Sequence, residues 1–174
     1  GMGIVENGHE KIYRSINPWD FLAIAERHEI ALLFNKNQFL AAAQLANLLA
    51  AKTTKNKTMY KQFAQAIDGY YSWDLFRHKE AHTHFERAKL EELSSTDDSP
   101  IRSFAEATSK LLPFLEETIS DSRDGKRPCL AYIIDLYANA ERRRQEGKID
   151  DAILRLYRLV EMAEQERLLS GYSI

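Results

Sequence analysis

Two helices joined by a short turn are predicted by residues 17–52, NPWDFLAIAERHEIALLFNKNQFLAAAQLANLLAAK. Asn17 offers a side chain that can cap the first amides of a helix, and the fixed backbone angle of Pro18 suits a first helical turn. Apolar residues then recur three and four positions apart in both halves, and the polar run 35–37 interrupts them. The stretch therefore predicts helices over residues 18–35 and 38–52 that pack as an antiparallel hairpin.

The same helical spacing continues along the rest of the chain. We expect further helices over about residues 60–71, 74 or 76 to 93, 100–120, 128–147 and from about 149 onward. Pro113 should kink or split the fifth helix of the chain, because proline lacks an amide hydrogen and crowds the preceding turn. No segment alternates between apolar and polar residues as a strand does. The sequence predicts an all-α fold of about seven helices in antiparallel hairpins.

A weak internal repeat places an alanine three positions after a larger side chain at Ala42, Ala81 and Ala152. The first two alanines lie 39 residues apart, near the period of helical repeats, but the third lies 71 residues further on. We therefore predict a tetratricopeptide-like bundle and not a regular array. In this interpretation, Ala152 marks a tight crossing between two helices.

The chain is expected to form one all-helical domain over residues 17–174. Gly1 before Met2 is typical of a tag remnant, and residues 1–16 are predicted to be disordered or tag-derived. The segment 94–100 is rich in serine and aspartate, so it is the place where a boundary inside the domain is possible.

The composition excludes several classes of protein. The 174 residues (20.1 kDa) can bury a substantial core, and 7 glycines with 4 prolines exclude collagen-like and low-complexity chains. A net charge of -2 lacks the basic excess of most nonspecific nucleic-acid binders. The single cysteine, Cys129, suits a reducing compartment, and the longest apolar run, 39–51, is too short for a membrane helix. We expect a cytoplasmic protein without membrane contact.

A histidine cluster in Arg77-His78-Lys79-Glu80-Ala81-His82-Thr83-His84 is the densest candidate for chemistry. His78 and His82 lie one helical turn apart and could offer two nitrogens to a metal, but a catalytic zinc normally takes three protein ligands. Arg77 with His82 or His84 fits the loose arginine–histidine spacings of helical ribonucleases. A solvated helix face explains the cluster as well, so we assign no catalytic residues, no metal and no cofactor.

Arg142, Arg143 and Arg144 are the candidates for contact with RNA. The surrounding stretch is nearly neutral, and three consecutive helical residues point about 100° apart. The three arginines also end a helix, where positive charge is favourable for electrostatic reasons alone. The aromatic residues Tyr70, Tyr71, Trp73 and Phe76 could stack on bases but are expected to be core.

Three blocks of sequence resemble a known family. They read Tyr71-x-Trp73-Asp74-x-Phe76-x-His78-Lys79-Glu80-Ala81, Asp135-Leu136-x-Ala138-Asn139-Ala140-x-Arg142-Arg143, and Gly147-x-Ile149-Asp150-Asp151-Ala152-x-x-Arg155-Leu156-Tyr157-Arg158-x-x-Glu161-x-x-x-Gln165-x-x-Leu168-Leu169. The blocks are similar to the helical region of the CRISPR-associated CARF-HEPN family of type III accessory effectors. In that family a CARF sensor domain is followed by helices and a HEPN ribonuclease.

The resemblance implies antiviral defence in which cyclic oligoadenylate is sensed and RNA is degraded. We expect this chain to lack the sensing half, and to end before the family's ribonuclease motif. Arg77 with His82 does not lie at the corresponding place, so no catalytic residue is carried over. The chain is therefore expected to be a helical fragment or a short relative of the family, and not itself an enzyme, although the full-length family includes ribonucleases.

The leading hypothesis is a non-catalytic scaffold or dimerisation module of a type III effector. Its expected partners are another protein or a second copy, with single-stranded RNA as a further candidate. One alternative is a tetratricopeptide-like interaction domain unconnected with CRISPR, and the other is a HEPN-like ribonuclease. In the leading hypothesis the resembling residues act in packing: Trp73, Phe76 and Tyr157 should be largely buried, and Asp74 and Glu80 should serve the start of the fourth helix.

Overall fold

The computed structural model describes residues 17–121 and 130–171, with side chains up to residue 168. All regular structure in these ranges is helical, which confirms the all-α class. The helices are α1 (Pro18–Asn35), α2 (Phe39–Lys52), α3 (Lys57–Asp74), α4 (His78–Ala88), α5 (Leu90–Ser94), α6 (Ser99–Ser109), α7 (Leu112–Asp121), α8 (Leu130–Gln145) and α9 (Ile149–Gly171). The expectations for residues 1–16, for most of the turn at 121–127 and for Cys129 fall outside the described residues.

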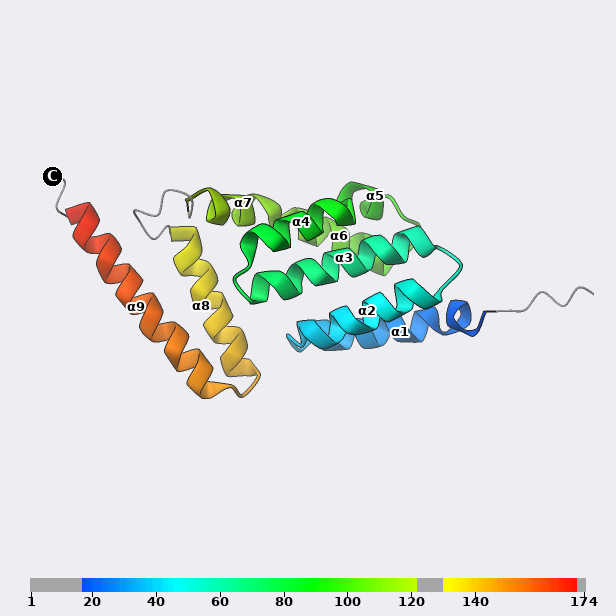
Figure 1. Ribbon diagram of the computed structural model, residues 1–174, viewed down its shortest axis with the longest axis horizontal. Coiled ribbons are helices and arrows are strands. Elements are labelled where there is room, and N and C mark those ends of the chain that lie inside the picture. Colours follow the sequence, from blue (N-terminus) through cyan, green and yellow to red (C-terminus); the bar gives the residue numbers. More distant parts are fainter. Residues whose placement is uncertain (1–16, 122–129, 172–174) are drawn as a thin grey trace, which may run out of the picture.

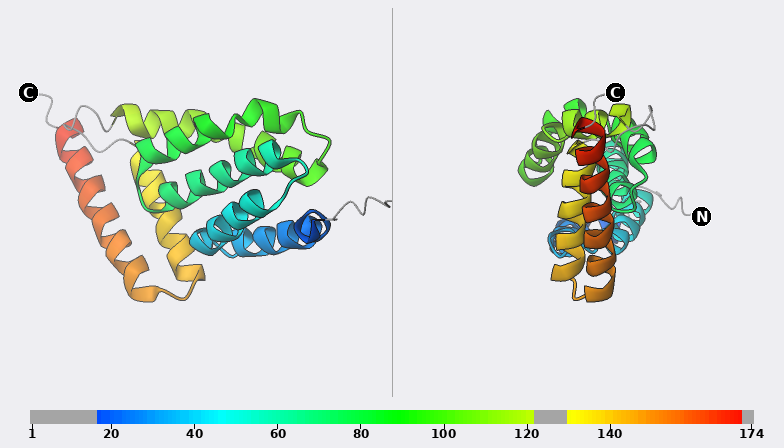
Figure 2. Two further views of the ribbon diagram at one scale, coloured as in Figure 1. Left: turned by 45° about the vertical axis from the view of Figure 1, so that its right-hand side comes forward. Right: turned by 90° about the vertical axis from the view of Figure 1, so that its left-hand side faces the viewer.

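Helices α1 to α7 form a layered bundle, and the hairpin of α8 and α9 crosses one end of it (Figure 1). A view from that end shows α8 and α9 side by side in front of the bundle (Figure 2). The contact between bundle and hairpin runs mainly through α8, so α9 lies outermost (Figure 1). This arrangement places the turn between α3 and α4 against the side of α8.

The first hairpin forms as the sequence predicts. The Asn17 side chain accepts a hydrogen bond from the Trp19 amide at 3.0 Å, and Pro18 occupies the first turn of α1. The Asn17 amide also donates to the carbonyl oxygen of Lys52 at 2.8 Å. One residue therefore caps the start of α1 and ties it to the end of α2.

Two predicted helices are each divided, so the prediction of about seven helices is corrected to nine in the described residues. The segment expected to continue to residue 93 breaks at Lys89, whose φ of 50° is incompatible with a helix. The next one splits before Pro113, which lies in the first turn of α7, where proline is tolerated. Asp98 and not Ser99 caps α6, accepting from the Ile101 amide at 3.2 Å.

The core of the bundle pairs small residues with aromatic rings. Alanines line α2, and Gly69 of α3 lets the Phe85 ring of α4 approach so closely that an added Cβ would lie 2.6 Å from it. Tyr70 meets Phe85 edge-on at 5.4 Å between ring centroids, and Trp73 meets it at 6.2 Å. This confirms the prediction that Trp73 is buried. Tetratricopeptide-like packing stays a prediction.

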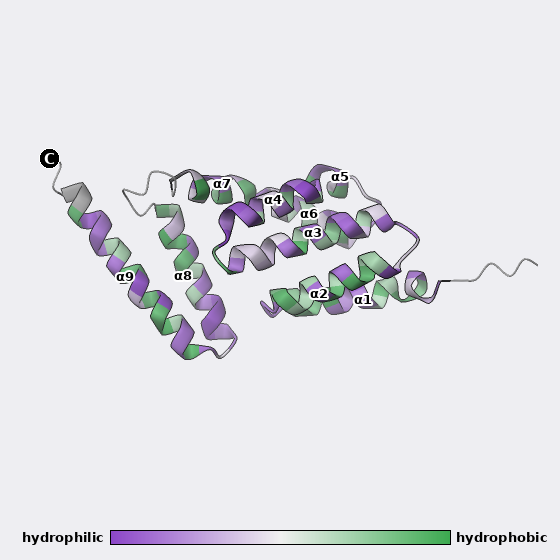
Figure 3. Ribbon diagram, viewed as in Figure 1, coloured by the Kyte–Doolittle hydropathy of each residue, from purple (hydrophilic) through white to green (hydrophobic). Residues whose placement is uncertain are grey.

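Many apolar side chains of α8 and α9 face solvent, and Figure 3 shows apolar residues along both helices. The exposed ones are Leu130, Ile134, Tyr137, Ile149, Ile153, Leu154, Leu156, Tyr157, Val160 and Leu168. Tyr157 is 68% exposed, so the prediction of its burial is wrong, because it lies on a face of α9 that no described element covers. Among the described helices, none combines the length and apolar character needed to cross a membrane.

Ala152 provides a test of the crossing between α8 and α9. It is buried in the first turn of α9, next to the turn that follows α8. Replacing Ala152 with leucine should lower the free energy of unfolding by about 1–3 kcal/mol, because the extra carbons have no space. Thermal unfolding measures this loss. The matched control is Ala163→Leu on the exposed side of α9, and an equal effect of the two variants would contradict a tight crossing.

Candidate functional site: the junction of α3, α4 and α8

Asp74, the last residue of α3, is the centre of a buried polar junction with α8. The Asn139 amide donates to Asp74 Oδ1 at 2.9 Å and to the Asp74 backbone oxygen at 2.9 Å. Arg142 Nε donates to Oδ1 at 3.1 Å, and Arg143 forms an ion pair with Oδ2. The Asp74 residue is only 6% exposed. A carboxylate at the negative end of a helix is unfavourable alone, so the two guanidinium groups are what make its burial tolerable.

These contacts correct the prediction that Asp74 serves the start of the fourth helix. Helix α4 begins only at His78, after a turn in which Phe76 has a φ of 59°. Glu80 does lie in the first turn of α4. Asp74 instead reaches across to α8.

Arg143 extends the junction to the turn between α8 and α9. Its Nη1 donates to Glu146 Oε2 at 2.8 Å, and its Nε lies 3.8 Å from Asp151 of α9. Lys148 Nζ also contacts Glu146, at 2.6 Å. Arg143 is 7% exposed. A single buried guanidinium thus joins the end of α3 to both helices of the hairpin.

Asp135 of α8 forms a second anchor one helical turn before Asn139. Its Oδ2 accepts from the Trp73 indole at 3.1 Å and lies 2.8 Å from His78 Nε2. All three residues are buried. The anchor therefore holds the last turn of α3 and the first residue of α4 on the same face of α8.

Aromatic contacts fill the space around the two anchors. The Tyr132 ring of α8 meets the Phe76 ring at 5.8 Å and the His78 ring at 5.6 Å between centroids. The Arg155 guanidinium of α9 lies 5.4 Å from the centre of the Phe76 ring. Phe76 is half-buried, so the prediction that it is largely buried is only partly met.

Burial acts on the Arg142 guanidinium, which lies at the edge of the junction. Desolvation lowers the pKa of Arg142, and the nearby Asp135 carboxylate offsets part of that effect. An arginine remains protonated despite such a shift. The charged groups of the junction thus have one another as their main partners. This arrangement fixes the orientation of α8 relative to α3, and it contains no activated nucleophile.

The structure separates the two histidines that were considered as metal ligands. His78 faces Asp135, while His82 lies between Glu86 of α4 at 3.7 Å and Glu116 of α7 at 3.5 Å. Within the described ranges, no three histidine, cysteine or acidic side chains are grouped as a metal site requires.

The candidates for ribonuclease chemistry are only partly brought together. Arg77 lies 3.7 Å from Glu80, and His84 lies 4.0 Å from the same side chain. His84 also contacts Gln65 at 3.2 Å. Arg77 and His84 therefore share a carboxylate partner, whereas His82 contacts other acidic residues.

The three arginines end α8, and they point to different partners, as their spacing predicts. Arg142 and Arg143 pair with Asp74, whereas Arg144 is exposed and pairs with Glu141 at 2.9 Å between Nε and Oε2. Contact with RNA at these residues stays a prediction, and Arg144 is the one whose charge faces solvent.

Two family models match the chain, one on each side of the junction. Residues 22–115, more than half of the chain, match the family model of the Csm6 6H domain. The chain belongs to the Csm6 family. Residues 121–174 match the model of the Csm6 HEPN domain. No curated protein and no solved structure matches the chain.

Membership of the Csm6 family makes this chain part of a CRISPR-associated type III accessory effector. It excludes the alternative of an interaction domain unconnected with CRISPR. It also assigns the block at 147–169 to the HEPN segment and not to the helices that precede it, because that block lies inside the HEPN match. The segment 94–100, considered as a boundary inside the domain, lies within the 6H match. That match ends at residue 115, and the HEPN match begins at residue 121.

The junction therefore joins the Csm6 6H and HEPN segments. Trp73, Asp74 and His78 lie in the first match, and Asp135, Asn139, Arg142 and Arg143 lie in the second. All seven residues stand in the sequence blocks that resemble the family, but nothing in the sequence shows that they pair. The available signal was the spacing of Asp135, Asn139 and Arg142, which places three polar side chains on one face of a helix that otherwise repeats apolar residues.

Proposed function

We propose that the 6H segment of this Csm6 chain is a non-catalytic scaffold that holds the HEPN helices α8 and α9 in one orientation. The assembly in which it does so is an RNA-degrading effector of type III CRISPR defence. The proposal rests mainly on one observation: the buried Asp74 carboxylate of the 6H segment receives Asn139, Arg142 and Arg143 of the HEPN segment.

A polar junction suits this role because charged pairs specify geometry. An apolar contact can slide or rotate at small cost, whereas a buried carboxylate that loses its partners pays the cost of desolvation. The Asp74 anchor and the Asp135 anchor both hold the turn between α3 and α4 against the same helix, α8. Two anchors on α8 restrict both its tilt and its rotation.

The orientation can be measured as a distance between spin labels on exposed positions of α3 and α9. In a Cys129→Ser background, Lys61→Cys and Glu164→Cys carry the labels. The parent should give one narrow distance distribution, and Asp74→Asn should broaden it. Asp68→Asn, a partly buried carboxylate that contacts Asn47 inside the 6H segment, is the control and should leave the distribution narrow. An unchanged distribution in Asp74→Asn would contradict the scaffold proposal.

The non-catalytic part of the proposal predicts that the purified chain does not cleave single-stranded RNA. The reason is that no catalytic residue of the family is carried over onto this chain, and that Arg77 and His82 contact different acidic side chains. Incubation with a labelled oligoribonucleotide tests this, with His82→Ala as the matched variant. Cleavage by the parent that is lost in His82→Ala would instead support a HEPN-like ribonuclease built on α4.

The exposed apolar residues of α8 and α9 support a protein partner or a second copy of the chain. Tyr137, Tyr157 and Leu154 all face solvent on this hairpin. Tyr157→Glu should therefore lower the mass of the chain's complex in light scattering, because it places a charge in the contact. If the parent chain is monomeric at high concentration, the hypothesis of a second copy is contradicted, and the partner would be a different protein.

A further inference from the structure

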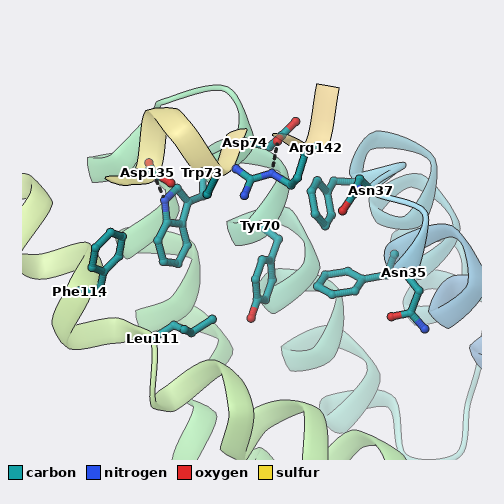
Figure 4. A pocket seen from close by; sticks show the side chains of 12 residues that line it. Asn35, Asn37, Tyr70, Trp73, Asp74, Leu111, Phe114, Asp135 and Arg142 are labelled. Carbon is teal, nitrogen blue, oxygen red and sulfur yellow. Dashed lines mark hydrogen bonds and ion pairs between the residues drawn. The ribbon is translucent and has the colours of Figure 1, made fainter. Parts of the chain in front are cut away.

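A cleft of about 380 Å³ opens beside the junction, between the 6H bundle and α8. Figure 4 shows Trp73 and Arg142 on one side of it, Tyr70 below them, Leu111 and Phe114 towards α7, and Asn35 and Asn37 at the turn between α1 and α2. The volume is near the lower end of the range for small-ligand sites, so it fits one nucleobase or nucleoside. None of the functions discussed above uses this space.

Five of the twelve residues that line the cleft are aromatic. Tyr70 and Trp73 lie with their ring planes only 19° apart and their centroids 6.3 Å apart, and Trp73 and Phe114 lie 25° and 6.3 Å apart. Phe34 and Phe39 complete the apolar lining. Such a wall favours a planar ligand that can stack on or between rings.

Two polar residues of α8, Asp135 and Arg142, line the same space. Arg142 uses Nε for Asp74, and its two terminal amino groups have no hydrogen-bond partner among residues 17–121 and 130–168. Asp135 is more than nine-tenths buried and uses Oδ2 for Trp73 and His78, while its Oδ1 has no hydrogen-bond partner in the same ranges. The cleft thus offers a fork of donors and a separate acceptor.

We propose that this cleft binds a guanine base. Guanine has two adjacent acceptors, O6 and N7, which match the donor fork of an arginine. Its neighbouring edge carries N–H donors, which suit the open oxygen of Asp135. Adenine presents a donor where guanine has O6, so the same fork discriminates against it. The cleft shares Trp73, Asp135 and Arg142 with the junction, but the proposal concerns a bound ligand and not the orientation of α8.

Guanosine monophosphate and adenosine monophosphate are the matched probes, because they differ only in the base. Nuclear magnetic resonance follows the indole N–H signal of Trp73, assigned by its persistence in Trp19→Phe. We expect a saturable shift with the guanine nucleotide, and binding weaker by roughly fivefold or more with the adenine nucleotide. Oligouridine with and without one internal guanosine distinguishes a base held in RNA from a free nucleotide.

Two variants test the cleft and a third serves as the control. Arg142→Lys keeps a positive charge but removes the fork, and should weaken the guanine nucleotide by roughly fivefold or more without affecting the adenine nucleotide. Ala138→Met fills the cleft from α8 and leaves every junction side chain in place. Arg144→Lys, outside the cleft, should leave binding unchanged. Equal binding of the two nucleotides, no saturable shift, or unchanged binding in Ala138→Met would overturn the proposal.

Discussion

Replacing Asp74 with alanine should lower the free energy of unfolding by about 3–5 kcal/mol. The change leaves Arg143 buried without the carboxylate that neutralises it, and leaves the Asn139 amide with only the backbone oxygen of residue 74. Removing one partner of a buried ion pair costs more than the pair contributes, because the remaining charge stays desolvated. Arg142, which is nearer to solvent, contributes less to the loss.

Urea denaturation followed by circular dichroism measures this effect, and Asp68→Asn provides the control. Burial raises the pKa of Asp68, although its hydrogen bond with Asn47 lowers it in part. A carboxyl group whose pKa is raised on folding stabilises the fold only when protonated, and this stability is lost as the pH rises through the folded pKa. Neutralising Asp68 at pH 7 should therefore leave stability unchanged or higher. A loss below about 1 kcal/mol in Asp74→Ala would contradict the junction described here.

The second large effect concerns the core of the bundle. Phe85→Ala should cost about 3–5 kcal/mol of unfolding free energy, because the ring is 2% exposed and contacts Tyr70, Trp73 and the open face of Gly69. Gly69 has no side chain with which to fill the space. The expected result is lower cooperativity together with lower stability.

Phe21→Ala is the matched control for Phe85→Ala. Phe21 is a phenylalanine on a helix of the same bundle, but it is 81% exposed. Phe21→Ala should change the free energy of unfolding by no more than about 0.5 kcal/mol. Equal losses in the two variants would show that Phe85 does not support the core as its burial indicates.

The helices could be predicted from the sequence because their signals are local. Apolar spacing gives the extent of α1 and α2, and Asn17 with Pro18 marks the start of α1. The break at Lys89 has no such signal, since lysine rarely adopts a positive φ. Pro113 predicted a break in the fifth helix, and in the structure α7 begins one residue before it, at Leu112.

The junction could not be predicted in the same way because its partners are distant in sequence. Asp74 meets Asn139, 65 positions away, and Trp73 meets Asp135, 62 positions away. Local patterns favoured a helix-start role for Asp74 and an electrostatic role for the arginines at the end of α8. Tyr157 was expected inside because the residues of the family resemblance were interpreted as packing positions, and nothing local shows which face of α9 is covered.

The position of the two anchors makes α9 a lever arm. The two anchors contact α8 directly. Helix α9 reaches the junction only near its beginning, where Asp151 lies close to Arg143 and Arg155 lies over the Phe76 ring. Its 23 residues span about 34 Å. A tilt of about 10° at the junction would move the far end of α9 by about 6 Å. A change too small to break a hydrogen bond at Asp74 would thus become a displacement larger than the rise of one helical turn.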